Sequence, residues 1–310
     1  MQVTPQDDGP PAGDPDDPRV LPFGGAHTGL KEDVVVRYLD FYLTALKNKG
    51  FTLTYVDAFA GSGWRRAAGG GRTEGCALRV LGMEKTFDRY VFGDLDPANV
   101  ASLTRAAEDQ RRRWEASGRF PRLPAISVRH ADANQLIEAE CARLRKSPRE
   151  RAVVFLDPFG MQVRWSTLEA IKATGAIDLW LLLPLYIGLG RMLSHSGRMP
   201  PAWERRIDDF LGYTEWRREV WQVREEPDLF SGISKRIERV SEPQLEKIVM
   251  GRLHGLFGGG LLPNVLQLPI KGRRSYTLVF ACSSPNPQAV GLAHRAARHI
   301  VEKAPVLRRR

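Results

Sequence analysis

Residues 55–63 carry the strongest structural signal in the chain: Tyr55-Val56-Asp57-Ala58-Phe59-Ala60-Gly61-Ser62-Gly63. A short apolar run ends in the carboxylate of Asp57 and passes into a loop with two glycines. Glycine tolerates positive φ and leaves the backbone open to a ligand. The pattern is typical of a buried parallel strand whose carboxyl end faces the binding crevice of an open α/β sheet. An ordinary surface turn after a buried strand is the alternative interpretation.

The two glycines narrow the class of ligand. Dinucleotide-binding enzymes use G-x-G-x-x-G at the start of a helix, but here the third glycine position is Arg66 and no helix follows at once. The remaining form, D-x-F-x-G-x-G, is typical of enzymes that bind S-adenosylmethionine. Phe59, Gly61 and Gly63 therefore join Asp57 as predicted cofactor-binding residues.

Apolar patterning further along the chain predicts alternating helices and strands. We expect helices over 28–46, 76–86, 97–117 and from 166 onward, and strands over 53–57, 89–93, 126–130, 152–156 and 177–183. Such alternation predicts a parallel, doubly wound sheet. Two later strands, 265–270 and 276–282, read as a hairpin before a closing helix, 286–304. The predicted fold class is thus α/β, Rossmann-like, with a mostly parallel sheet and an antiparallel last strand.

Four of the predicted parallel strands end on an aspartate: Asp57, Asp94, Asp132 and Asp157. Because parallel strands present their carboxyl ends to one crevice, we expect these acids to surround one ligand. The set fits S-adenosylmethionine. Asp57 would accept from the methionine ammonium, Asp94 from the ribose hydroxyls, and Asp132 or Asn134 from the adenine amino group. Each acid could instead be a helix cap or a surface residue.

The chain divides into five predicted segments. Residues 1–24 form a disordered acidic tail, 25–184 a cofactor-binding core, 185–240 a largely helical insert, 241–304 the completion of the core, and 305–310 a basic tail. The insert is rich in aromatic residues, and we expect it to select a substrate or partner. The alternative, which we favour for most of the aromatic residues, is that they form only the core of the insert itself.

Charge and composition constrain the partners. The chain has 46 basic and 36 acidic residues and a net charge of +10. The basic residues cluster at positions 65–79, 111–113, 143–151 and 271–274, which favours a polyanion such as RNA or DNA. A GC-biased genome and solvated helix faces would give similar clusters. The three cysteines lie far apart in the sequence, which argues against disulfides and metal sites, so we predict a protein without a bound metal. The sequence shows no secretory signal peptide and no apolar run long enough to span a membrane, so we predict a cytoplasmic location.

Several blocks in order resemble one family. The blocks are His27-Thr28-x-x-Lys31, Tyr38-Leu39, residues 55–61, Phe92-Gly93-Asp94 and Phe155-Leu156-Asp157-Pro158-Phe159-Gly160. Together they are similar to the three-Cys-motif partner (TcmP) family, over about residues 27–300. The resemblance implies a class I methyltransferase fold and a partner protein of the radical type that carries a three-cysteine motif. The family commonly has Glu at the position of Asp94.

The run Asp157-Pro158-Phe159-Gly160 bears on the reaction. It is similar to the D-P-P-Y-type motif of amino-methyltransferases and identical to the D-P-F-G of tRNA guanine-N2 dimethyltransferases. The resemblance implies that Asp157 and the Pro158 carbonyl accept the N–H bonds of an exocyclic amine, while Phe159 stacks on an extruded base. His27 and Lys31, at the front of the first helix, would point into the same crevice, or would instead lie at the surface as helix caps. A strand-ending turn with a buried Phe is the alternative.

We therefore expect an S-adenosylmethionine-dependent methyltransferase that acts on a base nitrogen of a nucleic acid. The same fold could methylate a protein or a small molecule. It could also be a non-catalytic nucleotide-binding partner of the radical protein in nucleic-acid repair or modification. A nuclease that binds metal through the clustered aspartates ranks last, because a second lysine-linked acidic motif is missing.

Overall fold

The computed structural model describes residues 26–66, 72–193, 199–228, 232–264, 266–270 and 273–304. The predicted acidic tail, 1–24, and the predicted basic tail, 305–310, lie outside the described residues. So do Val265, Lys271 and Gly272 of the predicted hairpin. Of residues 26–28 the backbone is described but not the side chains, so the predicted orientation of His27 is not tested.

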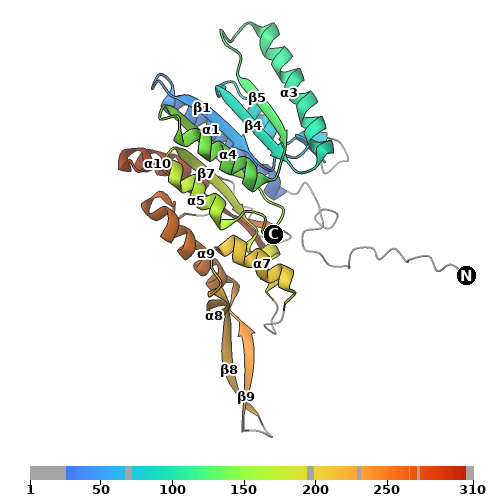
Figure 1. Cartoon of the computed structure of the whole chain (residues 1–310), viewed down its shortest axis with the longest axis vertical. Coiled ribbons are helices and arrows are strands. Elements are labelled where there is room, and N and C mark those ends of the chain that lie inside the picture. The colour runs from blue at the N-terminus through green and yellow to red at the C-terminus, as the bar shows by residue number, and fades with distance from the viewer. Residues whose placement is uncertain are drawn as a thin grey trace, which may run out of the picture.

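Within the described residues the main sheet has seven strands in the order β10-β11-β7-β6-β1-β4-β5 (Figure 1). Five run parallel: β1 (Thr52–Asp57), β4 (Arg89–Asp94), β5 (Ala125–His130), β6 (Glu150–Leu156) and β7 (Ile177–Leu183). The last strand, β11 (Arg273–Cys282), pairs antiparallel with β7 and with β10 (Leu266–Ile270). This arrangement confirms the predicted fold class. The antiparallel strand lies one place in from the edge, and β10 is the edge strand.

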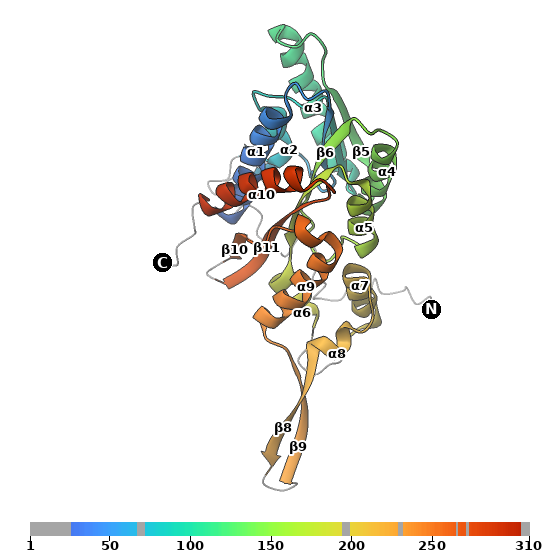
Figure 2. The same cartoon turned by 90° about the vertical axis from the view of Figure 1, so that its left-hand side faces the viewer.

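Helices cover both faces of the sheet (Figure 2). One face carries α1 (Ala26–Leu46), α2 (Cys76–Leu81), α3 (Pro97–Ser117) and α10 (Pro287–Glu302); the other carries α4 (Ala133–Arg145), α5 (Trp165–Thr174) and α9 (Glu242–Phe257). Alternate strand residues supply the two cores: Val153 and Phe155 of β6 face α1 and α10, and Val154 and Leu156 face α4 and α5. Because both faces are buried, these strands read as continuous apolar runs.

The second predicted helix was too long. It was expected over 76–86, but α2 ends at Leu81, where the Gly82 N–H closes on the Leu78 carbonyl at 2.8 Å. The Arg- and Gly-rich stretch before it forms a small hairpin of β2 (Trp64–Arg66) and β3 (Arg72–Glu74). This hairpin explains why β4 lies so far along the chain from Gly63.

The insert is helical only in its first part. A single π-helical turn η1 (Leu185–Leu189) leads through α6 (Gly190–Met192) to α7 (Pro201–Leu211) and α8 (Trp216–Val220). The rest is a two-stranded ribbon, β8 (Trp221–Asp228) and β9 (Gly232–Arg239), that extends away from the sheet (Figures 1 and 2). The expectation of a largely helical insert missed this ribbon. Most of its residues are polar, so the sequence lacks the apolar alternation that marks a half-buried strand.

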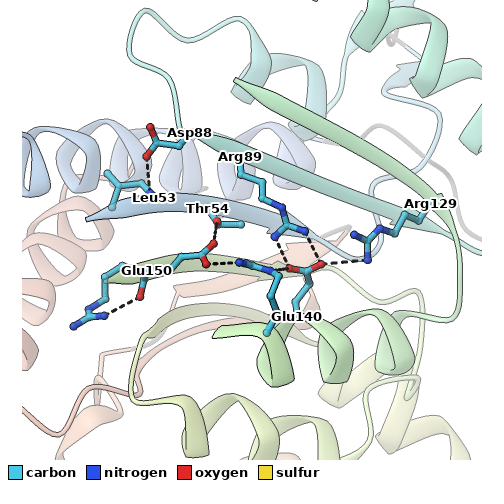
Figure 3. A network of polar contacts seen from close by, with 9 residues as sticks. Leu53, Thr54, Asp88, Arg89, Arg129, Glu140 and Glu150 are labelled. Carbon is cyan, nitrogen blue, oxygen red and sulfur yellow. Dashed lines mark hydrogen bonds and ion pairs between the residues drawn. The ribbon is translucent and has the colours of Figure 1, made fainter. Parts of the chain in front are cut away.

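A buried carboxylate joins α4 to the strands beneath it (Figure 3). Glu140 accepts from Arg89 of β4 at 2.5 and 2.9 Å and pairs with Arg129 of β5 at 3.2 Å. Burial raises the pKa of Glu140, but the arginines outweigh it and hold that pKa below the ordinary value. Arg143 bridges Glu140 to Glu150 at the start of β6. Arg143, from one of the predicted polyanion-binding clusters, is therefore engaged within the fold.

Candidate functional site

The four predicted aspartates lie along one edge of the sheet. Asp57 and Asp94 are the last residues of β1 and β4, Asp157 directly follows β6, and Asp132 lies two residues beyond β5. Two hollows open at this edge, with Phe59 and Phe159 lining both. Hollow A, of about 370 Å³, is lined by Asp94 and Asp132. Hollow B, of about 170 Å³, is lined by Asp57, Asp157, Lys31, Gly61 and Gly63.

The glycine loop is shaped for close approach to the backbone. Gly61 and Gly63 have φ of 60° and 79°. A Cβ on Gly63 would lie 3.0 Å from the side chains of Leu78 and Leu103, so only glycine fits there without a shift. A Cβ on Gly61 would meet nothing within 4 Å. The space beside Gly61 is therefore open to a ligand, and the reason for its glycine is the positive φ.

Asp94 fixes this loop against β4. Its Oδ2 accepts from the Gly61 N–H at 2.9 Å, and its Oδ1 accepts from the Asp96 N–H at 2.9 Å and from Asn99 Nδ2 at 3.1 Å. A carboxylate offers about four acceptor positions, so Asp94 retains one for a ligand. The residue has a structural role here that its position at the end of a strand did not reveal.

The carboxyl group of Asp57 is deeply buried, and few hydrogen bonds offset the cost of burying its charge. Its side chain is 1% exposed and accepts the Phe59 N–H at 3.1 Å. Burial first, and the nearby Asp157 second, raise the pKa of Asp57 to about 8. The surroundings therefore favour the protonated form of this carboxyl. A cation placed beside it would favour the ionised form, as expected of a binding site for an ammonium group.

Asp157 is held by Lys31, the residue predicted to point into the crevice from α1. The Lys31 ammonium makes an ion pair with Asp157 Oδ2. Tyr276 of β11 lines the same hollow, and burial followed by the neighbouring Asp157 raises its pKa to about 12. The structure thus brings Lys31 and Asp157 together at the crevice, with the amine of Lys31 on one oxygen of the carboxylate.

The two residues predicted to bind adenine, Asp132 and Asn134, have different hydrogen-bond partners in the structure. Asp132 caps α4, because its Oδ1 accepts from the N–H groups of Asn134 and Gln135 at 3.0 and 3.2 Å. The amide of Asn134 donates to the Gln162 carbonyl at 3.0 Å. Its Oδ1 accepts from the Arg164 N–H at 2.9 Å and from Thr167 at 2.8 Å. Because both lone pairs of its Oδ1 are used, Asn134 anchors the loop after β6 and has no acceptor for adenine. Of the two residues, only Asp132 remains a predicted acceptor for the adenine amino group.

The loop Asp157-Pro158-Phe159-Gly160 forms the ridge between the hollows. Pro158 and Gly160 are buried, whereas Phe159 is half-buried and lines both hollows. The Phe159 N–H donates to Gln162 Oε1 at 3.3 Å. The phenyl ring therefore stands where it can contact a ligand on either side.

Three parts of the site were missed by the sequence analysis. Glu32 of α1 pairs with Arg65 at 3.1 Å and Arg79 at 3.2 Å, and so ties α1 to the β2–β3 hairpin. Burial raises the pKa of Glu32 although these arginines act against it. Tyr276 enters hollow B from β11, and α7 borders hollow A. Only the Arg-rich composition of 65–79 signalled any of these, because the contacts join segments far apart in the chain.

No group of three or more His, Cys, Asp and Glu side chains among the described residues is placed to hold a metal ion. None of the helices described here is long and apolar enough to cross a bilayer.

Comparisons with known proteins show only distant likeness. No family model matches the chain, and no curated protein matches it. Among solved structures, protein LPL1258 from Legionella pneumophila is 13% identical, with 84% of this chain and 97% of that chain covered and a TM-score of 0.38. A putative S-adenosylmethionine-dependent methyltransferase from Listeria monocytogenes is 11% identical, with coverage of 82% and 98% and a TM-score of 0.34. Trm1 from Pyrococcus horikoshii, solved with S-adenosyl-L-methionine, is 11% identical, with coverage of 97% and 78% and a TM-score of 0.37. At these values the likeness assigns no function, and the function must be argued from the site.

Proposed function

We propose that this chain is an S-adenosylmethionine-dependent methyltransferase that methylates a base nitrogen of a nucleic acid. The observation that carries the proposal is the double hollow at the carboxyl edge of the sheet. One half holds Asp57 and Asp157 with the open glycine loop, the other holds Asp94 and Asp132, and Phe159 lines both.

The residues present fit the cofactor. Asp57, whose pKa is raised to about 8, is suited to a ligand ammonium that restores its charge. The spare acceptor of Asp94 suits a ribose hydroxyl, and Asp132 Oδ2 has no hydrogen bond to the described residues, so it suits the adenine amino group. When bound, S-adenosylmethionine supplies an electrophilic methyl group. The chain supplies the acceptors that hold it in one orientation.

The roles of the remaining residues follow from hollow B. Asp157 and the Pro158 carbonyl would accept the N–H bonds of the target amine and so orient its lone pair, while Phe159 packs against the base. Lys31 pairs with Asp157 through Oδ2, and the other acceptor positions of the carboxylate would serve that amine. Such a reaction depends on alignment of the nitrogen with the methyl group and needs little acid–base chemistry.

The distribution of charge supports a nucleic-acid substrate. Arg65 lines hollow B, Arg164 and Arg205 line hollow A, and all three lie at the crevice. The first residues of β11 lie at the same edge, because Thr277 of β11 pairs with Leu183 at the end of β7. Arginines around the crevice would hold phosphates on either side of an extruded base.

A second proposal concerns a protein partner. The ribbon β8–β9 exposes an apolar cross-strand pair, Val223 and Ile237, whose side chains are 64% and 48% exposed. This surface favours a protein that acts with the chain, and the TcmP resemblance suggests a three-Cys-motif protein. Methyl transfer by the purified chain alone would show that catalysis needs no such partner. Transfer that depends on an added three-Cys-motif protein would support the accessory role.

Calorimetric titration with S-adenosylmethionine and S-adenosylhomocysteine tests the cofactor site. We expect Asp94→Ala to weaken binding by about tenfold or more, since a lost hydrogen bond to a charged group costs about 1.5–3 kcal/mol. The matched control is Asp96→Ala, two residues away, whose side chain caps α3 at 2.8 Å. Unchanged affinity in Asp94→Ala would overturn the assignment of the hollows.

Transfer is tested with labelled cofactor on separate pools of RNA, DNA and protein. Asp157→Ala should bind the cofactor normally and transfer no methyl group. RNA or DNA binding should weaken steeply with salt because phosphate contacts release counterions. Labelling confined to the protein pool would contradict a nucleic-acid substrate. So would RNA or DNA binding whose affinity does not change with salt concentration.

A further inference from the structure

Helix α7 of the insert forms the outer wall of hollow A. Ala202, Arg205, Arg206 and Asp209 all line this hollow. Their spacing of three, four and seven residues places them on one face of the helix. The facing wall is made by the ends of β4 and β5, with Asp94 and the residues around Asp132. An insert expected to select a substrate thus contributes to the half of the crevice assigned to adenosine.

The position of α7 is fixed at its carboxyl end. Gly212, which caps the helix with φ of 72°, packs so closely on Trp165 of α5 that an added Cβ would lie 2.3 Å from the ring. Arg252 of α9 lies over the Trp165 ring at 4.5 Å and donates to the Leu211 carbonyl at 3.0 Å. Close packing on two core helices holds the lining face of α7 toward hollow A.

A second face of α7 is anchored as well. Asp208 accepts from Trp216 Nε1 at 2.7 Å and pairs with Arg217 at 2.9 Å. These contacts join α7 to α8 and do not involve the four residues that line the hollow. Ala202 and Arg205 take part in none of these anchors, so either can be changed without removing them.

The lining face suits the flat face of a purine. Ala202 is small and exposed and leaves room beside the hollow, and Arg205 is exposed with a planar guanidinium that can stack on an aromatic ring. The sheet side offers acceptors, Asp94 and Asp132, for the ribose and the purine edge. The hollow thus has polar acceptors on one side and a stacking surface on the other.

We infer that α7 is part of the cofactor site, with Ala202 and Arg205 setting the affinity for the adenosine half. The inference rests on the proposed function, because it takes hollow A as the adenosine site. It makes the insert a direct contact of the cofactor. A helix that merely covers the core is the alternative.

The test compares two ligands by calorimetry. S-adenosylhomocysteine fills both hollows, whereas 5′-methylthioadenosine lacks the amino-acid portion and fills only hollow A. Ala202→Trp places an indole into the hollow, and we expect it to weaken both ligands by the same factor, at least about tenfold. Arg205→Ala should weaken both by about fivefold, the size of a cation–π contact. Asp57→Asn should weaken only S-adenosylhomocysteine, since only that ligand carries the ammonium.

Arg218→Ala is the matched control, because Arg218 is an exposed arginine on α8 that lines neither hollow. Wild-type affinity in Ala202→Trp, checked by circular dichroism to be folded, would overturn the inference and leave the proposed function standing. Failure of wild-type protein to bind either ligand would overturn the proposed function, and the inference with it. A loss confined to S-adenosylhomocysteine in Ala202→Trp would move α7 to the methionine half.

Discussion

The ionisation of Asp57 depends strongly on its surroundings. Its pKa is raised to about 8 in the folded chain, against about 4 in an unfolded one. The folded protein therefore keeps a proton that the unfolded chain releases. This contribution to stability is fully present below about pH 4 and is lost as the pH rises toward 8, by up to about 1.4 kcal/mol per pH unit.

We predict that Asp57→Asn removes this pH dependence. Urea unfolding of the unliganded protein at pH 5.5, 6.5 and 7.5 should show wild type losing stability relative to Asp57→Asn at each step, because asparagine has no proton to lose. The comparison isolates Asp57, since all other titrating groups are shared. Parallel stability curves for the two proteins would mean that Asp57 is ionised already.

The Lys31–Asp157 pair gives a second prediction at this scale. The two side chains are 11% and 23% exposed. We expect Lys31→Met to lower the free energy of unfolding by about 1–3 kcal/mol, because it leaves a half-buried carboxylate without its partner. In an Asp157→Asn background the same change should cost clearly less. Additive effects in this double-mutant cycle would show that the pair contributes no coupling energy.

Chain order explains which site residues could be predicted. Asp57, Asp94 and Asp157 follow strands that read clearly as parallel, and parallel strands end at one edge. The sequence placed Tyr276 on a strand. Whether its side chain faces hollow B depends on the register of β11 with β7, which the sequence does not give. Neither the pair of Glu32 with Arg65 nor the capture of Asp157 by Lys31 follows from spacing in sequence, because both need the packing of α1 against the crevice.

At the scale of elements, the strands of the main sheet were predictable because burial on both faces makes them apolar throughout. The ribbon β8–β9 was not, since the part of its surface that the structure describes is largely exposed and it has no core of its own. The placement of α7 was likewise unpredictable. Its amphipathic pattern predicts a helix with a buried face, but not that the opposite face lies over hollow A.

Two glycines at helix ends offer a matched test of how α7 is held. Gly118 and Gly212 both cap helices in the left-handed region, with φ of 60° and 72°. A Cβ on Gly118 meets nothing within 4 Å, whereas one on Gly212 overlaps Trp165. We predict that Gly118→Ala costs about 1–2 kcal/mol from backbone strain alone. Gly212→Ala should cost about 1–3 kcal/mol more, because of overpacking.

The measurement is urea unfolding of both variants, together with titration of S-adenosylhomocysteine. Gly212→Ala should also weaken ligand binding, because it displaces the helix that walls hollow A. Equal destabilisation by the two substitutions would mean that Trp165 moves aside freely. In that case the end of α7 is not fixed by this contact.

At the scale of the whole molecule, the arginines fall into two groups: those that pair with buried acids within the fold, and those that line the crevice. Arg89 and Arg143 neutralise buried glutamates beneath α4, whereas Arg164 and Arg205 line hollow A. Net charge alone therefore overstates the surface available to a polyanion. The argument for nucleic acid depends on where the arginines lie, and less on their number.

The ribbon tests how far substrate binding extends beyond the crevice. It belongs to the same insert as α7, and two contacts fix its base. The ring of Trp221 packs against that of Trp216, with ring centroids 5.5 Å apart, and Arg239 donates a hydrogen bond to the Gly190 carbonyl at 2.5 Å. We predict that replacing residues 223–237 with a short Gly-Ser turn leaves S-adenosylhomocysteine affinity within about twofold. Both hollows lie outside the deleted segment and both anchors remain.

Methyl transfer to the preferred pool should fall in the same variant, because its exposed cross-strand apolar pair and both open strand edges are gone. Since Val223 and Ile237 lie directly opposite each other, the double substitution Val223→Ser with Ile237→Ser separates the apolar pair from the ribbon itself. A loss of transfer in both variants assigns the effect to the apolar pair. Full transfer by the deletion variant would confine substrate recognition to the crevice and α7, and the ribbon would then serve only contacts with another protein.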